Sequence, residues 1–141
     1  QSTGTDIKMA LDKVNQILKR RSIIFLVSDF MADPESYRRQ LSVTNRRHDL
    51  IAVDLNDPLD SEIADVGLLV VEDPESGAIE WIDTGSQKWQ DAFRERMGQL
   101  ETDKTRVFRQ ASVDRIDINT AEEYTIPLTR FFQDRAKRIR H

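Results

Sequence analysis

Two short, unbroken apolar runs dominate the pattern of hydrophobic and polar positions. Residues 22–30 read SIIFLVSDF, and residues 50–55 read LIAVDL. Runs of this length without polar alternation are typical of strands buried on both faces, as in parallel sheets. We therefore predict two buried strands, of which 22–30 is the central one around which the chain is organised.

Around these runs, apolar residues recur every three or four positions, the spacing of amphipathic helices. One predicted helix precedes residue 22 and ends in the basic residues 19–21. A second begins with Asp33 as N-cap and Pro34 at its first position. A long helix is predicted over residues 86–110.

The C-terminal part of the chain predicts one more strand and one more helix. Residues 113–118, VDRIDI, are predicted to form a third strand of the main sheet. Thr120 and Glu123 have the spacing of a capping box at the exit of that strand. Pro127 lies near the start of the last helix, where its missing N–H is tolerated.

Residues 68–83 carry the signal of a β-hairpin. Two apolar segments, 68–72 and 78–83, flank a turn in which Gly77 is free to adopt a positive φ. In the second arm, Ile79 and Trp81 alternate with Glu80, which predicts one exposed face. Trp81 and the nearby Trp89 either anchor a partner or cover the edge of the sheet.

The order strand, helix, strand implies right-handed crossovers and parallel pairing. The pattern therefore predicts an α/β fold: an open, mainly parallel sheet with flanking helices and a β-hairpin insertion. The 141 residues are enough for a single domain, 1–141, with a core of its own.

Composition narrows the possible classes of function. The chain has no cysteine, which excludes disulfides and thiolate metal sites. Charged residues make up 33% of the chain, with the two signs interleaved and a net charge of -4. The sequence therefore lacks the basic stripe that would indicate a nucleic-acid-binding protein. No stretch approaches the ~18 apolar residues of a membrane span, and no signal peptide precedes the first helix. We expect a cytoplasmic protein without a membrane span.

Asp29 follows the organising strand, where ligands gather in open parallel sheets. It is either a site residue or the start of a turn. Asp54 and Asp57 lie near the end of the second strand, and hard oxygen ligands of this kind suit Mg²⁺ or Mn²⁺. One hypothesis is therefore a Mg-dependent phosphate-ester hydrolase or phosphotransfer domain that uses Asp29 with Asp54 or Asp57.

Recognisable catalytic motifs are missing from the sequence. It contains no GxSxG, no HExxH and no phosphate-binding glycine loop. His48 precedes the second strand and is therefore expected at the amino edge of the sheet, away from Asp29. We interpret His48 as structural.

Several segments in order resemble one family. They are residues 4–7 (GTDI), 24–30 (IFLVSDF), 48–53 (HDLIAV), 73–84 (DPESGAIEWIDT) and the closing Pro127-Leu128 with Phe131-Phe132 and Arg135. Together they resemble the second half of a von Willebrand factor A domain, which has a Rossmann-like fold. More narrowly, the chain is similar to the bacterial family catalogued as domain of unknown function fifty-eight, commonly encoded beside MoxR-type AAA+ ATPases.

The resemblance implies a metal-ion-dependent adhesion site, which that fold builds from three loops. Thr5 matches the threonine of the second loop, and Asp29 matches the aspartate of the third. The first loop carries D-x-S-x-S, which does not occur in this sequence. The chain begins where the second loop falls, so we expect a truncated domain in which the site for Mg²⁺ or Mn²⁺ lacks some of its ligands.

The resemblance also implies a class of function. Such a site binds a partner through a metal-bridged contact, without making or breaking a bond. We therefore expect a non-enzymatic protein-interaction module whose partner is a MoxR-type AAA+ ATPase or the client of that ATPase. An exposed sheet edge in a truncated domain would also allow a homodimer.

Overall fold

The computed structural model describes residues 4–56, 68–73, 75–121, 123 and 125–139. The first half contains helix α1 (Gly4–Ile17), strand β1 (Ile23–Ser28), the 3-10 helix η1 (Pro34–Ser36), helix α2 (Arg38–Arg47) and strand β2 (Asp49–Asn56). The second half contains strands β3 (Leu68–Glu72) and β4 (Ile79–Asp83), helix α4 (Gln87–Gln110), strand β5 (Asp114–Asn119) and helix α5 (Thr125–Ile139).

The main sheet has the strand order β1-β2-β5, and both neighbouring pairs are parallel. β3 and β4 form a separate antiparallel hairpin, with Gly77 at a φ of 72° in its turn. These features confirm the predicted α/β class, the parallel pairing and the hairpin insertion. β2 is the middle strand of the described sheet.

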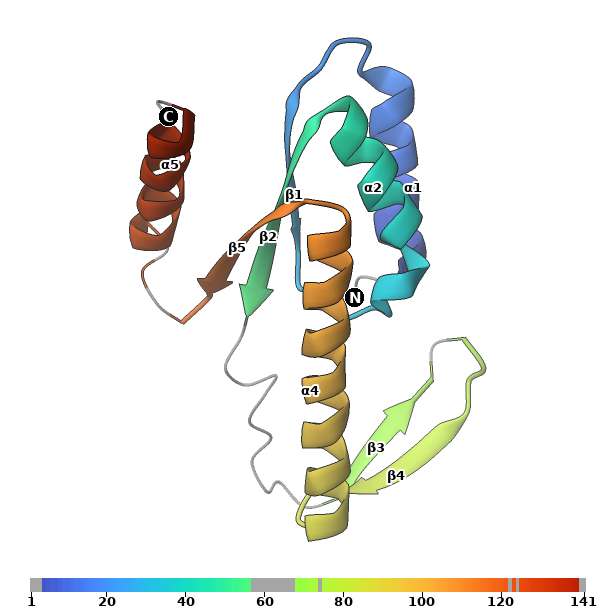
Figure 1. Ribbon diagram of the computed structural model, residues 1–141. Helices are drawn as coiled ribbons and strands as arrows, with labels where there is room; N and C mark the ends of the chain where they lie inside the picture. The colour runs from blue at the N-terminus through green and yellow to red at the C-terminus, as the bar shows by residue number, and fades with distance from the viewer. Residues whose placement is uncertain (1–3, 57–67, 74, 122, 124, 140–141) are drawn as a thin grey trace.

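Helices cover both faces of the main sheet, which gives three layers (Figure 1). Side chains alternate along β2, so that Leu50 and Ala52 face α1, α2 and α4, whereas Ile51 and Val53 face α5. The cluster on the α5 side is the smaller one. The larger cluster contains Ile7, Leu11, Phe30, Tyr37, Leu41, Leu50, Ala52, Val107, Phe108, Ala111 and Val113.

The prediction that β1 is a central strand buried on both faces is wrong. Ile23, Phe25 and Val27 are 63%, 44% and 57% exposed. β1 lies at the edge of the described sheet, and α5 packs mainly against β5. The α5-facing side of β1 therefore opens into an apolar groove of about 550 Å³, lined by Phe25, Val27, Val53, Leu55, Ile118, Asn119, Thr120, Leu128 and Phe132.

The helix predicted after Asp33 consists of two pieces. Asp33 caps η1, its side chain accepting a hydrogen bond from the Glu35 amide at 3.1 Å. Tyr37 separates η1 from α2 with a φ of -123°, which is not helical. This break lets the Tyr37 ring enter the core beside Phe30, with ring centroids 6.0 Å apart.

The capping box predicted for Thr120 and Glu123 does not form as expected. α5 begins at Thr125, and Glu123 accepts hydrogen bonds from both the amide and the hydroxyl of Thr125. The Thr120 amide donates instead to the Asn56 carbonyl at 2.9 Å. Thr120 thereby continues the contact between β5 and β2 rather than starting a helix.

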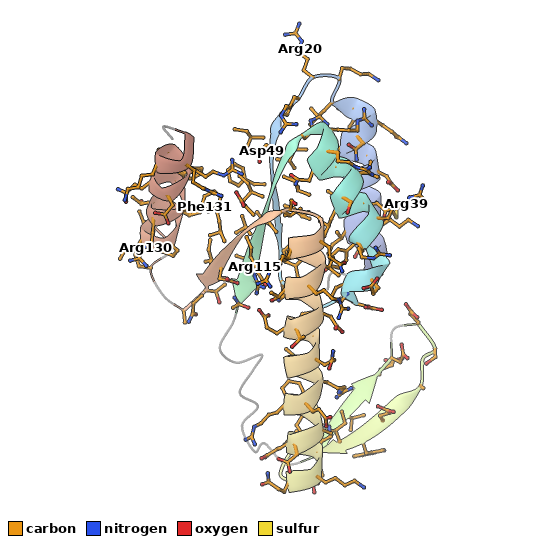
Figure 2. All side chains as sticks on the ribbon, viewed as in Figure 1. Arg20, Arg39, Asp49, Arg115, Arg130 and Phe131 are labelled. Carbon is orange, nitrogen blue, oxygen red and sulfur yellow. The ribbon has the colours of Figure 1, made fainter. Side chains whose placement is uncertain are left out.

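α5 is attached to the sheet by an arginine as well as by apolar contacts. Arg135 donates hydrogen bonds to Asp49 and Asp114, each at 2.8 Å from its Nη2. The guanidinium also lies 5.3 Å from the centre of the Phe131 ring. Figure 2 shows Asp49 on the sheet opposite Phe131 on α5. Arg135 therefore ties α5 to the first residue of both β2 and β5.

Replacing Arg135 by leucine should lower the free energy of unfolding by about 2 kcal/mol at pH 7, since hydrogen bonds to charged groups are each worth roughly 1.5–3 kcal/mol. Urea denaturation followed by circular dichroism measures this loss. Arg138→Leu is the control, because Arg138 contacts Asp114 at 3.3 Å from an exposed position and should contribute less than about 1 kcal/mol.

The effect of Arg135→Leu should also depend on pH. Hydrogen bonds from Arg135 hold the pKa of Asp49 below its ordinary value of 3.8. The stabilisation is therefore fully present above 3.8 and is lost as the pH falls through the lower pKa of the folded state. The difference between the parent chain and Arg135→Leu should shrink below about pH 4. An equal loss at pH 3 and pH 7 would contradict the assignment.

Candidate functional site

The carboxyl ends of the three parallel strands meet at one edge of the sheet. In the register of the sheet, Ser28 of β1 lies opposite Asp54 of β2, and Asn56 of β2 lies opposite Asn119 of β5. α1 also begins at this end of the molecule, because it runs antiparallel to β1 (Figure 1). Segments far apart in the sequence are thus brought together where open α/β sheets bind ligands.

The loop after β1 has a fixed conformation. The Ser28 hydroxyl accepts a hydrogen bond from the Phe30 amide at 3.0 Å, and Asp29 Oδ1 accepts one from the Met31 amide at 3.2 Å. Phe30 has a φ of 51°, a left-handed conformation that is uncommon for a residue with a side chain. Backbone strain of this kind is kept only where the surroundings enforce it.

The buried ring of Phe30 supplies that enforcement. It is fully buried and packs edge-on against Phe108 at 5.2 Å between ring centroids, besides its contact with Tyr37. The ring anchors the loop, and the neighbouring Asp29 remains partly exposed. The structure therefore presents the Asp29 carboxylate at the carboxyl edge of the sheet, as the sequence predicted.

Thr5 lies in the first turn of α1, at the same end of the molecule as Asp29 (Figure 1). Its side chain lies outside the described part of the chain. Asp57, a further predicted site residue, also lies outside the described residues.

Asp54 forms a buried ion pair and does not lie among exposed metal ligands, as the sequence suggested it would. Its side chain is fully buried on the α4 side of the sheet, 2.6 Å from Lys104 Nζ and 2.9 Å from Arg115 Nη2. Burial raises the pKa of the Asp54 carboxyl above its ordinary value, against the opposing effect of the Lys104 and Arg115 charges. Two cations thus neutralise the carboxylate within the protein, which removes it from the predicted metal-binding group.

Arg115 extends this buried pair into a network between the sheet and α4 (Figure 2). It donates hydrogen bonds to Glu101 at 2.7 Å, to Asp117 at 2.9 Å and to Thr105 at 3.2 Å. Burial alone would lower the pKa of Arg115, but the carboxylates around it raise it. Sequence reasoning missed this network.

One signal in the sequence could have indicated the network. Lys104 occupies a position of the apolar stripe of α4, four residues after Leu100 and three before Val107. Asp54 likewise interrupts an otherwise apolar strand. A cation and an anion that each stand at a core position favour a buried pair, because a buried charge needs a partner.

His48 lies at the opposite edge of the sheet and is buried. Its Nδ1 accepts a hydrogen bond from the Ser22 amide at 3.0 Å, at the turn where the chain enters β1. This position is the amino edge of the sheet, as predicted, and it separates His48 from Asp29. The interpretation of His48 as structural is consistent with this contact.

Comparison with known proteins places the chain in a family. The sequence model of the family described as "Protein of unknown function DUF58" matches residues 1–103. This chain belongs to the DUF58 family. The DUF58 chain is also similar to uncharacterized proteins from species of Mycobacterium, two of which illustrate the match.

Both relatives are 26% identical to the DUF58 chain over 132 residues, which is 94% of the chain. They are uncharacterized protein MAV169 of Mycobacterium avium and uncharacterized protein Rv1480 of Mycobacterium tuberculosis. The matched segment covers 77% of the former but 41% of the latter. No solved structure matches the DUF58 chain.

The resemblance to von Willebrand factor A domains makes a divalent metal at Asp29 a testable expectation. Within the described residues, no three His, Cys, Asp or Glu side chains are grouped closely enough to hold a metal ion. Asp29 Oδ1 already accepts a backbone hydrogen bond, and Asp54 is paired with cations. The described part of the DUF58 chain therefore does not fit a complete metal centre.

The helices give one further result. Searched over the described residues, none of them combines the length and the apolar character that crossing a bilayer requires.

Proposed function

We propose that this DUF58 chain is a protein-interaction module of the von Willebrand factor A type, with the carboxyl edge of its sheet facing the partner. The observation that carries the proposal is the position of Asp29. Its partly exposed carboxylate follows a parallel strand directly, in a loop that two local hydrogen bonds and the buried Phe30 ring hold in place. A binding group on a rigid element loses little conformational entropy when a partner docks.

The proposed site includes part of a metal-ion-dependent adhesion site. Asp29 and Thr5 are the two positions that the resemblance assigns to Mg²⁺ or Mn²⁺. Because the described residues do not make a complete centre, we propose that these two positions contribute to a metal site without forming it alone. Hard oxygen donors such as a carboxylate and a hydroxyl are of the kind that these cations prefer.

The alternative hypothesis, a Mg-dependent phosphate-ester hydrolase or phosphotransfer domain, has less support. It requires Asp29 to act together with Asp54 or Asp57. The Asp54 side chain is buried and neutralised by Lys104 and Arg115, so it is not free to bind a metal beside Asp29. We therefore favour a binding module over an enzyme.

The proposed partner is a MoxR-type AAA+ ATPase or the client of that ATPase. This assignment rests on the resemblance stated above. Within the described residues no strand pairs with the outer edge of β1, which offers a second mode of association, because a strand edge with unpaired backbone groups is a template for pairing. A homodimer through β1 therefore stays a prediction.

Replacing Asp29 by asparagine should weaken binding to a MoxR-type ATPase from the same organism by about tenfold or more. Asparagine keeps an oxygen that can accept the Met31 amide hydrogen bond, so the loop is retained while the charge is lost. Isothermal titration calorimetry in Mg²⁺ and again in EDTA measures the affinity and its dependence on metal.

Asp33→Asn is the matched control. Asp33 lies in the same loop region, and its side chain likewise accepts a hydrogen bond from the amide two positions later in the chain, that of Glu35. In this case the hydrogen bond caps η1. Its replacement should leave the affinity unchanged within about twofold. If both variants bind as tightly as the parent chain, Asp29 does not face the partner. If both are weakened equally, the loop conformation and not the Asp29 charge is responsible.

A further inference from the structure

The hairpin formed by β3 and β4 presents an exposed apolar face. Val70 pairs with Trp81 in the register of the hairpin, and Glu72 pairs with Ile79. Because side chains alternate along a strand and directly paired residues share a face, Ile79 and Trp81 lie on one face together with their cross-strand neighbours Glu72 and Val70. Val70, Ile79 and Trp81 are 56%, 63% and 71% exposed. We call these three residues the Trp81 face.

The Trp81 face is not part of the core of the domain. Among the described hairpin residues, none belongs to either hydrophobic cluster. Figure 1 shows the hairpin projecting from the start of α4, at the end remote from the loop between α1 and β1. Contiguous exposed apolar side chains on a projecting element mark interaction sites, and tryptophan is enriched among the residues that dominate binding energy.

Both ends of the hairpin are held in a defined conformation. In the turn, the Asp73 amide donates to the Ala78 carbonyl and the Gly77 amide donates to the Asp73 carbonyl, each at 2.8 Å. At the base, Gln90 of α4 donates to the Thr84 carbonyl at 2.7 Å. A preorganised surface loses less entropy on binding than a flexible one.

The charge of the hairpin selects the kind of partner. Residues 68–86 include five carboxylates, Glu72, Asp73, Glu75, Glu80 and Asp83, and no lysine or arginine. This charge repels the phosphates of nucleic acids and the anionic headgroups of membranes. It attracts a basic polypeptide, since complementary charges steer partners together and disfavour wrong ones.

The backbone of the hairpin also favours an extended partner. No described strand pairs with the outer edge of β3 or of β4, so each edge can accept an added strand. A strand with period-two alternation would place its aliphatic residues beside the Trp81 face. Its basic residues would then lie on the other face with Glu80, while Glu72, on the face of Ile79 and Trp81, adds negative charge to the same hairpin.

We propose that the hairpin binds an extended segment of a partner protein in which lysine or arginine alternates with aliphatic residues. This surface is separate from the Asp29 edge and does not depend on the function proposed there. The Trp81 face supplies the apolar contact, and the hairpin carboxylates supply charge complementarity.

Trp81 itself can report the binding. The chain has two tryptophans, and the second, Trp89, stacks on Phe93 with ring centroids 5.4 Å apart. Trp89→Phe keeps an aromatic ring in that stack and leaves Trp81 as the single tryptophan. The probes are two nine-residue peptides, one alternating lysine with valine and the other alternating glutamate with valine.

The lysine–valine peptide should shift the Trp81 emission to shorter wavelength in a saturable way, because the indole leaves water. The affinity should fall as the salt concentration rises. The glutamate–valine peptide should produce no shift. Absence of a shift with the lysine–valine peptide, or an equal shift with both peptides, would overturn the proposal.

Charge reversal provides the matched variants. Glu72→Lys combined with Glu80→Lys should lower the affinity for the lysine–valine peptide by about tenfold or more. Asp12→Lys combined with Asp134→Lys changes the net charge equally on exposed positions of α1 and α5 and should leave the affinity unchanged. Circular dichroism confirms that both double variants are folded. An equal loss in both would mean that overall charge, not the hairpin, is responsible.

Two other occupants of the Trp81 face are tested with the same protein. Concentration-dependent sedimentation that Trp81→Ser abolishes would identify a second copy of the chain. A blue shift with anionic phospholipid vesicles, larger than with the lysine–valine peptide, would identify a membrane surface. Either result would overturn the proposal.

Discussion

Replacing Lys104 by methionine should destabilise the folded chain by about 3–5 kcal/mol, the usual cost of removing one partner from a buried ion pair. Methionine has nearly the shape of the lysine stem, so the packing of α4 is kept while the charge is lost. The Asp54 carboxylate then stays fully buried with Arg115 as its remaining cation. Urea denaturation at pH 7 measures the loss.

The loss caused by Lys104→Met should be smaller at pH 5 than at pH 7. Burial already raises the pKa of Asp54, and removal of the Lys104 charge raises it further. A carboxyl whose pKa is raised in the folded state favours folding below its ordinary value of 3.8, and this contribution is lost as the pH rises through the folded-state pKa. At lower pH the Asp54 carboxylate of the variant therefore becomes protonated, and the difference in unfolding free energy between the variant and the parent chain becomes smaller.

Arg106→Met is the control for this prediction. Arg106 lies on the same helix and contacts Glu35 at 3.4 Å and Asp103 at 3.1 Å, but its side chain is about half exposed. Exposed pairs of this kind contribute about 0–1 kcal/mol. Equal destabilisation by Lys104→Met and Arg106→Met would show that the Asp54 pair is not energetically distinct.

Replacing Phe30 by alanine should cost about 3–5 kcal/mol, because it removes a fully buried ring and leaves a cavity. Phe25→Ala should cost less, since Phe25 is exposed on the edge strand β1 and contacts Phe132 at 6.0 Å between ring centroids. Thermal and urea denaturation of the two variants compare the two sites directly.

A second variant at the same position isolates the backbone strain. Within regular secondary structure, a protein with glycine at a given position is usually less stable than the same protein with alanine there, by about 0.5–1 kcal/mol. At the φ of 51° that residue 30 adopts, the order should reverse, because glycine enters the left-handed region without steric cost. Phe30→Gly should therefore be at least as stable as Phe30→Ala. The opposite order would mean that the loop relaxes once the ring is removed.

The sequence pattern predicted the elements of the fold well because their signals are local. The apolar run at 50–55, the N-cap and proline at Asp33-Pro34 and the turn at Gly77 each depend on neighbouring residues only. The edge position of β1 could not be predicted in this way. Its apolar run is the same whether a strand lies inside a sheet or at its edge, and only the strand order and the placement of α5 distinguish the two.

The candidate site shows the same limit. The position of Asp29 followed from the end of a strand, and the structure places it there. The role of Asp54 depends on Lys104, which is 50 positions later, and on Arg115. Such a long-range pairing cannot be inferred from local spacing, and local spacing alone groups Asp54 with Asp29 as a candidate metal ligand. The left-handed conformation of Phe30 was equally invisible, because phenylalanine gives no local signal for it.

The strand order of the main sheet also has a kinetic consequence. β1 meets β2 across a short crossover, since Ile23 pairs with Asp49. β2 meets β5 across a crossover more than twice as long, since Ile51 pairs with Asp114 and the hairpin and α4 lie between them. Closing the longer loop costs roughly 0.6 kcal/mol more for each doubling of its length, and non-local pairing slows folding. We therefore expect the unit of β1, α2 and β2 to form early during synthesis and β5 to join it only after α4 has emerged.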